Sequence, residues 1–311
     1  MGQEQPIITK RRRHHHHPVN EKNLLVATFL NLLITMVQVA GSLLSGSIAL
    51  LSDALHNLSD TFATFIAYMA IRIGKRNANP KKTFGYKRAE ILSALLNAVI
   101  LIVMSVFLTL EAYKRFYEQR EINSMIMILV AMIGLLANIF SASILKKDAH
   151  KNINIKAAYV HLLGDALTSL MVVIGGVLIR FREIYWIDPL ITILISLYIV
   201  REALVILKQA VNILMQSAPE HLDIQTIRKQ VEAFPEINNM HHIHTWMLTD
   251  HEIHLEAHVE LINDLKVSQI DEIRQELATL LYEEFEIEHI TLQFEFNPGH
   301  PARTISHKTE S

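Results

Sequence analysis

Two well-separated stretches of the chain carry an imidazole and a carboxylate at the same spacing. His56 is followed by Asp60, and His161 is followed by Asp165, so both stretches read His-x-x-x-Asp. Residues at this spacing lie on one face of a helix, so each stretch would direct both groups the same way. Two such helices facing one another would offer two nitrogen and two oxygen ligands to one point, a set that suits tetrahedral Zn²⁺. We therefore predict that these four residues form one metal site.

The position of the two pairs strengthens this prediction. Both lie inside long apolar segments, and His56 and His161 are the only histidines in those segments. A central Asp in a membrane helix costs about 2.5–3.5 kcal/mol on insertion scales, so a functional role is the default expectation. One pair alone is explained equally well by an intrahelical hydrogen bond that fixes helix packing. Two identical pairs on two segments favour a shared site.

Two polar residues beside the first pair have two interpretations each. Asn57 either orients the neighbouring ligand or packs between helices. Asp53 lies either at the mouth of the site or at an ordinary helix interface. The residue pattern does not choose between these alternatives.

The apolar segments predict a membrane protein. Half of the 311 residues are hydrophobic, and residues 24–52, 91–110 and 122–145 contain no Asp, Glu, Lys or Arg. Runs of this length are candidates for membrane-spanning helices. We predict an all-α bundle of six spans, at residues 24–44, 48–73, 89–113, 122–145, 155–179 and 186–207.

The distribution of basic residues predicts the orientation of the bundle. Six spans put both termini on one side, and the links on that side contain more Lys and Arg than the opposite links. The positive-inside rule therefore places both termini in the cytoplasm of a multi-pass protein of the plasma membrane. Asp60 and Asp165 then fall near the middle of the membrane.

After the last predicted span the pattern changes to that of a soluble domain. Helical spacing and strand-like alternation follow one another in the order α-β-β-α-β, which predicts a small two-layer α+β domain. The expected elements are residues 224–234, 241–248, 253–261, 270–285 and 290–296. In the second strand we expect His254, Glu256, His258 and Glu260 on the solvent-facing side.

These patterns divide the chain into four parts. We predict a basic, histidine-rich cytoplasmic tail, the transmembrane domain, a cytoplasmic metal-binding and dimerisation domain, and a flexible tail, at residues 1–22, 23–208, 209–298 and 299–311. Residues 1–20 lack the apolar core and cleavage site of a secretory signal. The run from His14 to His17 either binds metal weakly or reflects composition alone. The net charge of −2 gives no sign of a nucleic-acid partner, and we expect none.

Three groups of residues resemble the cation diffusion facilitator family, and within it the zinc-transporting branch. They are the two His-x-x-x-Asp pairs, the stretch FGYKRAEIL at residues 84–92, and the stretch His241-x-x-His244-x-Trp246. The resemblance covers residues 24–296. It implies a homodimeric metal/proton antiporter that exports metal from the cytoplasm, with a ferredoxin-like cytoplasmic domain that binds regulatory metal.

The resemblance also assigns ligands. The family's transport ligands match His56, Asp60, His161 and Asp165, and its cytoplasmic-domain ligands match His241, His258 and Glu295. Without the resemblance, the many histidines between residues 241 and 289 fit either metal ligands or an ordinary polar sheet face. Some members bind a further metal between spans two and three, but residues 75–86 contain no His, Asp or Glu, so we predict no site there. The absence of cysteine leaves the stoichiometry of the cytoplasmic site open.

Charge suggests a mechanism for the predicted site. Two carboxylates balance one Zn²⁺, whereas the empty site in apolar surroundings favours proton uptake. Metal and protons therefore compete for the same groups, since imidazole binds metal only when it is neutral. We predict export of Zn²⁺, with Cd²⁺ and Co²⁺ as further candidate substrates, in exchange for protons by alternating access.

Two other functional classes stay open. An intramembrane zinc enzyme would need an open coordination position for water, and the membrane segments contain no His-Glu-x-x-His motif, so we expect no enzyme. A membrane metal sensor would bind Zn²⁺ without transporting it. In every case the expected partners are a second copy of the chain, the lipid bilayer and divalent metal ions.

Overall fold

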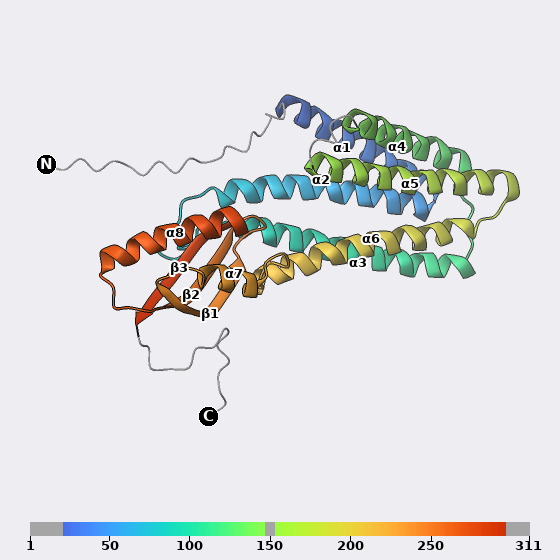
Figure 1. The fold of residues 1–311 in the computed structure, drawn as a ribbon. Coiled ribbons are helices and arrows are strands. Elements are labelled where there is room, and N and C mark those ends of the chain that lie inside the picture. The colour runs from blue at the N-terminus through green and yellow to red at the C-terminus, as the bar shows by residue number, and fades with distance from the viewer. Residues whose placement is uncertain (1–20, 147–152, 297–311) are drawn as a thin grey trace. The chain divides into compact units, whose positions relative to one another are not determined.

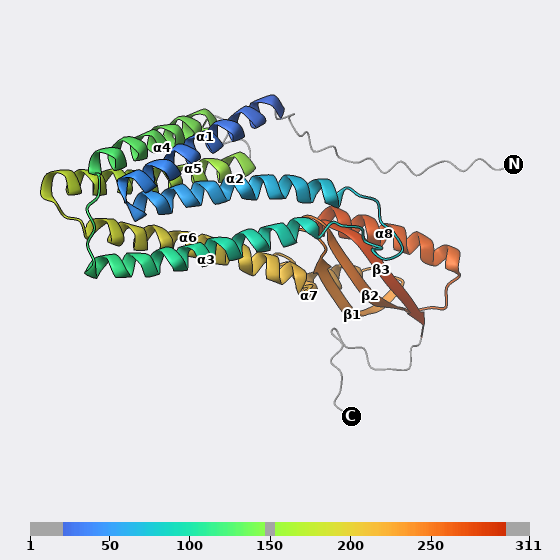
Figure 2. The same ribbon diagram turned by 180° about the vertical axis from the view of Figure 1, so that it is seen from behind.

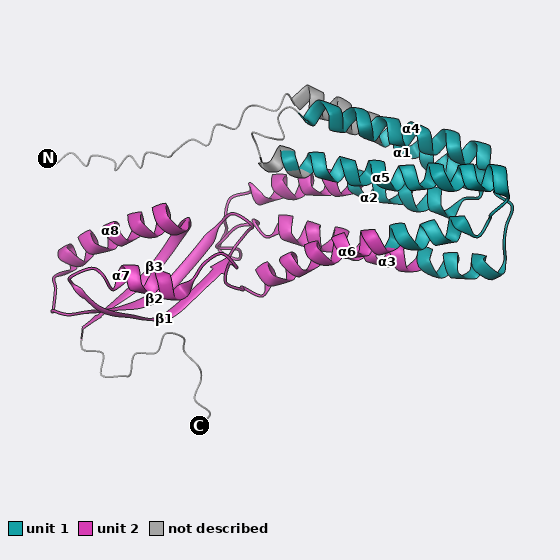
Figure 3. Ribbon diagram, turned by 45° about the vertical axis from the view of Figure 1, so that its right-hand side comes forward, with its two compact units in different colours: residues 1–61, 108–196 teal, residues 62–107, 197–311 magenta. Residues whose placement is uncertain are grey.

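The computed structural model describes residues 21–146 and 153–296, which form the helices α1 to α8 and the strands β1 to β3 (Figures 1 and 2). The run from His14 to His17 and the predicted C-terminal tail lie outside the described residues. The chain forms two compact units (Figure 3). The first comprises residues 1–61 and 108–196, and the second comprises residues 62–107 and 197–311.

Six long helices occupy the six segments that the apolar pattern predicts. Their bounds are Glu21–Ser45 for α1, Ile48–Gly74 for α2, Ala89–Tyr117 for α3, Ser124–Leu145 for α4, Ile153–Arg182 for α5 and Ile187–Leu214 for α6. The helices α3 and α6 continue several residues beyond the predicted spans. Both extensions contain polar residues that the apolar pattern alone could not assign to a helix.

Four of the described helices are long and apolar enough to cross a membrane. They are α3, α4, residues 158–182 of α5, and α6. In α1 the described apolar stretch, Leu32–Ser45, is shorter. The helix α2 carries Asp53, His56, Asn57 and Asp60 along one apolar segment, and these residues lower its hydropathy. These helices are those of a membrane protein. The count of six spans stays a prediction.

Close helix contacts in the first unit depend on glycine. A Cβ atom added to Gly41 of α1 would lie 2.6 Å from a methyl group of Val130 on α4. A Cβ atom added to Gly176 of α5 would lie 2.7 Å from Ile128, also on α4. Small residues let two helix backbones approach closely. In a membrane this close van der Waals packing drives helix association, because the lipid tails are as apolar as the side chains. These two glycines therefore allow α4 to pack against both α1 and α5.

A carboxylate of α6 holds the beginning of α2. Asp188 accepts hydrogen bonds from the backbone N–H groups of Ile48 and Ala49, at 2.9 and 3.3 Å, and from the hydroxyl group of Ser47 at 2.5 Å. The first N–H groups of a helix have no partner within the helix and attract negative charge. Asp188 thus caps a helix that begins far from it in the sequence. Its side chain is fully buried.

The C-terminal α+β domain lies entirely in the second unit. It consists of α7 (Ile224–Val231), β1 (Ile237–Met247), β2 (Ile253–Leu261), α8 (Val267–Phe285) and β3 (Ile287–Phe296). The sheet order is β1-β2-β3, with β1 antiparallel and β3 parallel to β2. The predicted order α-β-β-α-β is confirmed, although α7 ends before residue 234 and β1 begins before residue 241.

One face of this sheet and one stripe of α8 form a common core. In β2, Leu255, Ala257 and Val259 are buried, as the alternation predicts. Leu277 and Leu281 of α8 are fully buried against the same cluster. The domain therefore has a hydrophobic core of its own.

The prediction that His254 faces solvent is wrong. Only 2% of this residue is exposed, because its ring stacks on Trp246 and also contacts the rings of His289 and Phe84. Phe84 comes from the link between α2 and α3, so strand alternation alone could not predict this cover. Burial lowers the pKa of His254, which keeps the imidazole neutral at physiological pH.

The hydrophobic core leads to a prediction about how substitutions change the stability of the isolated domain, residues 218–298. Leu277→Ala should lower its free energy of unfolding by about 2–5 kcal/mol, because a fully buried side chain leaves a cavity. Urea unfolding followed by circular dichroism measures the change. Val267→Ala is the control on the same helix, since Val267 is 82% exposed and should change the value by less than about 0.5 kcal/mol. Equal losses in both variants would contradict the assigned core.

Candidate functional site

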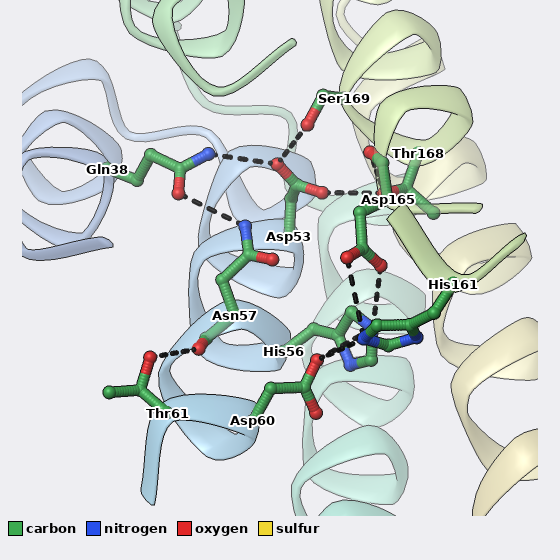
Figure 4. Close-up of polar contacts among 10 residues, drawn as sticks. All are labelled: Gln38, Asp53, His56, Asn57, Asp60, Thr61, His161, Asp165, Thr168 and Ser169. Carbon is green, nitrogen blue, oxygen red and sulfur yellow. Dashed lines mark hydrogen bonds and ion pairs between the residues drawn. The ribbon is translucent and has the colours of Figure 1, made fainter. Parts of the chain in front are cut away.

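The structure brings the two His-x-x-x-Asp pairs together. Nε2 of His161 on α5 lies 3.1 Å from a carboxylate oxygen of Asp60 on α2, and 3.5 Å from one of Asp165 (Figure 4). Nε2 of His56 lies 3.4 Å from a carboxylate oxygen of Asp165 and 3.7 Å from one of Asp60. Each imidazole therefore contacts both carboxylates. Ligand atoms of His56, Asp60 and Asp165 lie within 4.8 Å of one another.

The four side chains differ in exposure. His56 and Asp165 are 6% exposed, Asp60 is 27% exposed and His161 is 49% exposed. Among the described residues, neither ring nitrogen of His56 has a hydrogen-bond partner of good geometry, and neither has Oδ1 of Asp165. Buried polar atoms without such partners are rare and require an explanation. A metal ion held between these atoms would provide one, so the donor set fits Zn²⁺.

A second polar network lies beside the four residues. The carboxylate of Asp53 accepts hydrogen bonds from Thr168 at 2.7 Å, from Ser169 at 2.9 Å and from the side-chain amide of Gln38 at 3.2 Å (Figure 4). Gln38 in turn accepts a hydrogen bond from Asn57 at 3.1 Å. Asp53 is fully buried, so it is an interface carboxylate and not a residue at the mouth of the site.

This network joins α1, α2 and α5 next to the candidate ligands. Asp53 precedes His56 by one helical turn, and Thr168 follows Asp165 by one turn. The hydroxyl group of Thr168 also donates to the backbone carbonyl of Asp165. The hydrogen bonds therefore fix the faces of α2 and α5 that present the candidate ligands.

Three residues of this network were missed in the sequence. Thr168 and Ser169 lie on the α5 face that carries Asp165, so helical spacing from that residue could have drawn attention to them. Gln38 is an isolated side-chain amide in an apolar helix, and only the tertiary contact of α1 with α2 reveals its partners.

A second cluster lies in the C-terminal α+β domain. Nδ1 of His258 is 2.8 Å from one carboxylate oxygen of Glu295, and Nε2 of His241 is 3.4 Å from the other. The two imidazole rings lie 5.4 Å apart. His241 is 1% exposed, Glu295 12% and His258 22%. The three residues that the family resemblance assigns to this domain are therefore neighbours, and they offer two nitrogens and a carboxylate to a metal ion.

The strand β1 has an irregularity directly after His241. In this strand, His241 pairs with His258 of β2 and His244 pairs with Glu256 of β2. Between these two pairs β1 therefore has one more residue than β2. In this interval, His242 has a left-handed backbone with φ of 49°. Such bulges re-aim side chains and concentrate near functional sites. His241 lies directly opposite His258, so the two side chains share one face of the sheet, and the bulge places His244, opposite Glu256, on that same face.

Family models match nearly the whole chain. The model of the cation efflux transmembrane domain matches residues 24–215, and the model of the cytoplasmic domain of cation efflux proteins matches residues 219–297. The chain belongs to the cation efflux family, or cation diffusion facilitators. This is a family of cation transporters and not of enzymes.

Relatives from several bacteria align over most of the chain. The metal cation efflux system protein CzcD of Cupriavidus metallidurans is 37% identical over 93% of this chain and 90% of its own length. The zinc transporter ZitB of Escherichia coli is 36% identical over 90% of this chain and 89% of its own. The cadmium, cobalt and zinc/H(+)-K(+) antiporter of Bacillus subtilis is 34% identical, with 89% of each chain covered.

The cluster in the α+β domain predicts stabilisation by zinc. If His241, His258 and Glu295 bind the ion in the folded state only, zinc at about 100 times its Kd should add about 2.7 kcal/mol to the stability of the isolated domain. Calorimetry with and without zinc measures this effect. His258→Ala should abolish it, whereas His251→Ala should keep it, because His251 is 87% exposed and outside the cluster. Equal responses of the two variants would assign zinc binding to other residues.

Proposed function

We propose that this protein is a secondary active transporter that exports Zn²⁺ from the cytoplasm in exchange for protons. The observation that carries the proposal is the convergence of His56 and Asp60 on α2 with His161 and Asp165 on α5. Membership of the cation efflux family supports metal cation efflux as the overall activity. The relatives' names support zinc as a substrate and extend the candidates to cadmium and cobalt.

Electrostatics favours a divalent ion at this position. The four side chains bring two carboxylates and, when the imidazoles are neutral, no compensating charge. A Zn²⁺ ion would make the cluster neutral and so lower the cost of keeping it among apolar helices. Two imidazole and two carboxylate ligands also suit Zn²⁺ better than Mg²⁺, which prefers oxygen ligands and near-octahedral geometry. The proposed preference for zinc thus follows from the donor types.

The same atoms provide the proposed coupling to protons. The imidazole nitrogens lie 3.1–3.7 Å from the carboxylate oxygens, and both kinds of group can take up protons in place of a metal ion. Free imidazole has a pKa of about 6.5, so a protonated form is accessible near neutral pH. Metal and proton then occupy the site alternately. Alternating access of the site to the two sides of the membrane would convert this competition into exchange.

The proposed topology has six spans, with both termini in the cytoplasm of a plasma-membrane protein. The polar residues that lower the hydropathy of α2 are Asp53, Asn57 and the proposed ligands His56 and Asp60. They are compatible with a spanning helix whose polar face is directed into the bundle. The excess of Lys and Arg in the links between α2 and α3 and between α4 and α5 supports the orientation.

We further propose a homodimer regulated through the C-terminal α+β domain. The match to the cytoplasmic domain of cation efflux proteins supports this assignment. The cluster of His241, His258 and Glu295 would bind zinc when its cytoplasmic concentration rises. A fully metal-bound cluster would stabilise one arrangement of the two protomers and so bias transport.

Replacing a single ligand tests the transport site. Asp165→Ala should reduce zinc flux into dye-loaded vesicles by at least about 100-fold, because the remaining ligands neither balance nor enclose the ion. Asp60→Ala should have the same effect. Glu111→Ala is the control, since this carboxylate of α3 pairs with Arg115 and lies outside the cluster.

Amounts of folded protein in the vesicles must be equal for all variants, as judged by size-exclusion chromatography. Unchanged flux in Asp165→Ala or Asp60→Ala would refute the transport site. Zinc binding without flux in the unmodified protein would instead indicate a sensor.

A pH step tests the exchange of zinc for protons. With equal zinc on both sides of oriented vesicles, acidification of the face opposite the α+β domain should drive zinc toward that face. Protons moving down their gradient would supply the free energy, and a tenfold proton gradient corresponds to about 1.4 kcal/mol per proton. A protonophore should abolish the net movement. Flux that responds to neither treatment would identify a passive metal pathway.

A further inference from the structure

A basic cavity lies in the second unit between the link that precedes α3 and the strand β1. Its volume is about 450 Å³, and it is lined by residues 81–89, Leu92, Gln216, Trp246 and Leu248. This volume is in the range of small-ligand sites. The proposed metal ligands are not part of its lining, and the proposed transport activity does not use it.

The charged residues that line the cavity are all basic. Its lining includes four basic residues, Lys81, Lys82, Lys87 and Arg88, and no acidic residue. Lys87 is neutralised in part, since its Nζ lies 2.5 and 2.7 Å from the two carboxylate oxygens of Glu252. Three basic side chains are left to attract an anion. Tyr86 and Trp246 provide aromatic walls beside them.

Arg88 contributes a guanidinium group to the lining of this cavity. Its Nε atom is buried and has no hydrogen-bond partner among the described residues. A guanidinium group presents its donors in a planar fork that matches phosphate oxygens, and a buried unpaired donor costs free energy unless a ligand or water meets it. Because Nε itself is not accessible, an anion in the cavity would meet the rest of this guanidinium group.

The position of the cavity favours a phosphate close to the membrane. Ala89, the first residue of α3, lines it. The helix α3 is also one of the four helices long and apolar enough to cross the membrane in the described part of the chain, and Leu92 lies one turn inside it. Basic pockets at the end of membrane helices are suited to anionic lipid headgroups.

We propose that the basic cavity binds a phosphate-bearing anion, either the headgroup of an anionic phospholipid or a soluble phosphate. Lys81, Lys82 and Arg88 would contact the phosphate oxygens, and the aromatic walls would enclose the group. Such a ligand also affects the α+β domain, because it competes with Glu252 for Lys87. It would therefore act on the contact between the link before α3 and Glu252, the residue that precedes β2.

Trp246 reports on the cavity in the full-length protein. The chain contains two tryptophans, so Trp186→Phe leaves Trp246 as the single emitter. We expect its emission to shift either in nanodiscs that contain phosphatidylglycerol or when inorganic phosphate is added to nanodiscs of phosphatidylcholine alone. The first result identifies a lipid headgroup as the source, and the second identifies a soluble phosphate. Absence of a shift with both probes overturns the proposal.

Matched variants separate the cavity from general surface charge. Lys81→Gln/Lys82→Gln removes two exposed charges of the lining, and it should raise the amount of probe needed for a half-maximal shift roughly tenfold. Lys75→Gln/Arg76→Gln removes two exposed charges of the same link outside the lining and should change it less than about twofold. Arg88→Gln should act like the first variant. Equal effects of the two double variants would show diffuse attraction and overturn the cavity as a binding site.

Discussion

Buried carboxylates impose the constraint on which the first unit depends. An ionised carboxylate among apolar helices is stable only when donors or positive charge surround it. Asp53 and Asp188 meet this requirement with hydroxyl, amide and backbone N–H donors, which stay in place once the helices have packed. Asp60 and Asp165 instead contact imidazoles, whose charge changes with protonation and whose nitrogens also bind metal. The first two carboxylates therefore hold helices together, and the other two belong to the proposed transport site.

The two proposed metal sites arise from different backbone geometries. The site in the helices uses the spacing of one helical turn twice, so each helix supplies a complete imidazole–carboxylate pair. The site in the sheet takes one residue from each of three strands, and β1 has a bulge directly after the residue that it contributes. Each of the two helices thus forms half of the site from residues that are one turn apart in the sequence. The sheet site exists only after all three strands have paired.

This difference explains how far the sequence could predict the structure. The His-x-x-x-Asp pairs were visible because helix periodicity is local, and the order α-β-β-α-β was visible because alternation and helical spacing follow one another along the chain. The contacts of Gln38 with Asp53 and Asn57 were not visible, since they join separate helices. The burial of His254 was mispredicted because its cover comes partly from Phe84, far away in the chain. The number of membrane spans was also not settled, since the residues that form the proposed site make α2 less apolar.

The capping of α2 by Asp188 has a consequence for the order of assembly during synthesis. The N–H groups of Ile48 and Ala49 receive their acceptor from a residue that the ribosome adds only after α5 is complete. Both residues are buried, and a buried backbone N–H group without an acceptor costs free energy comparable to a lost hydrogen bond. The first turn of α2 therefore gains these acceptors only after α6 has been made and has packed against it. The second helix to be made is among the last to be finished, and a chain truncated before α6 would expose the unfinished end of the helix that carries His56 and Asp60.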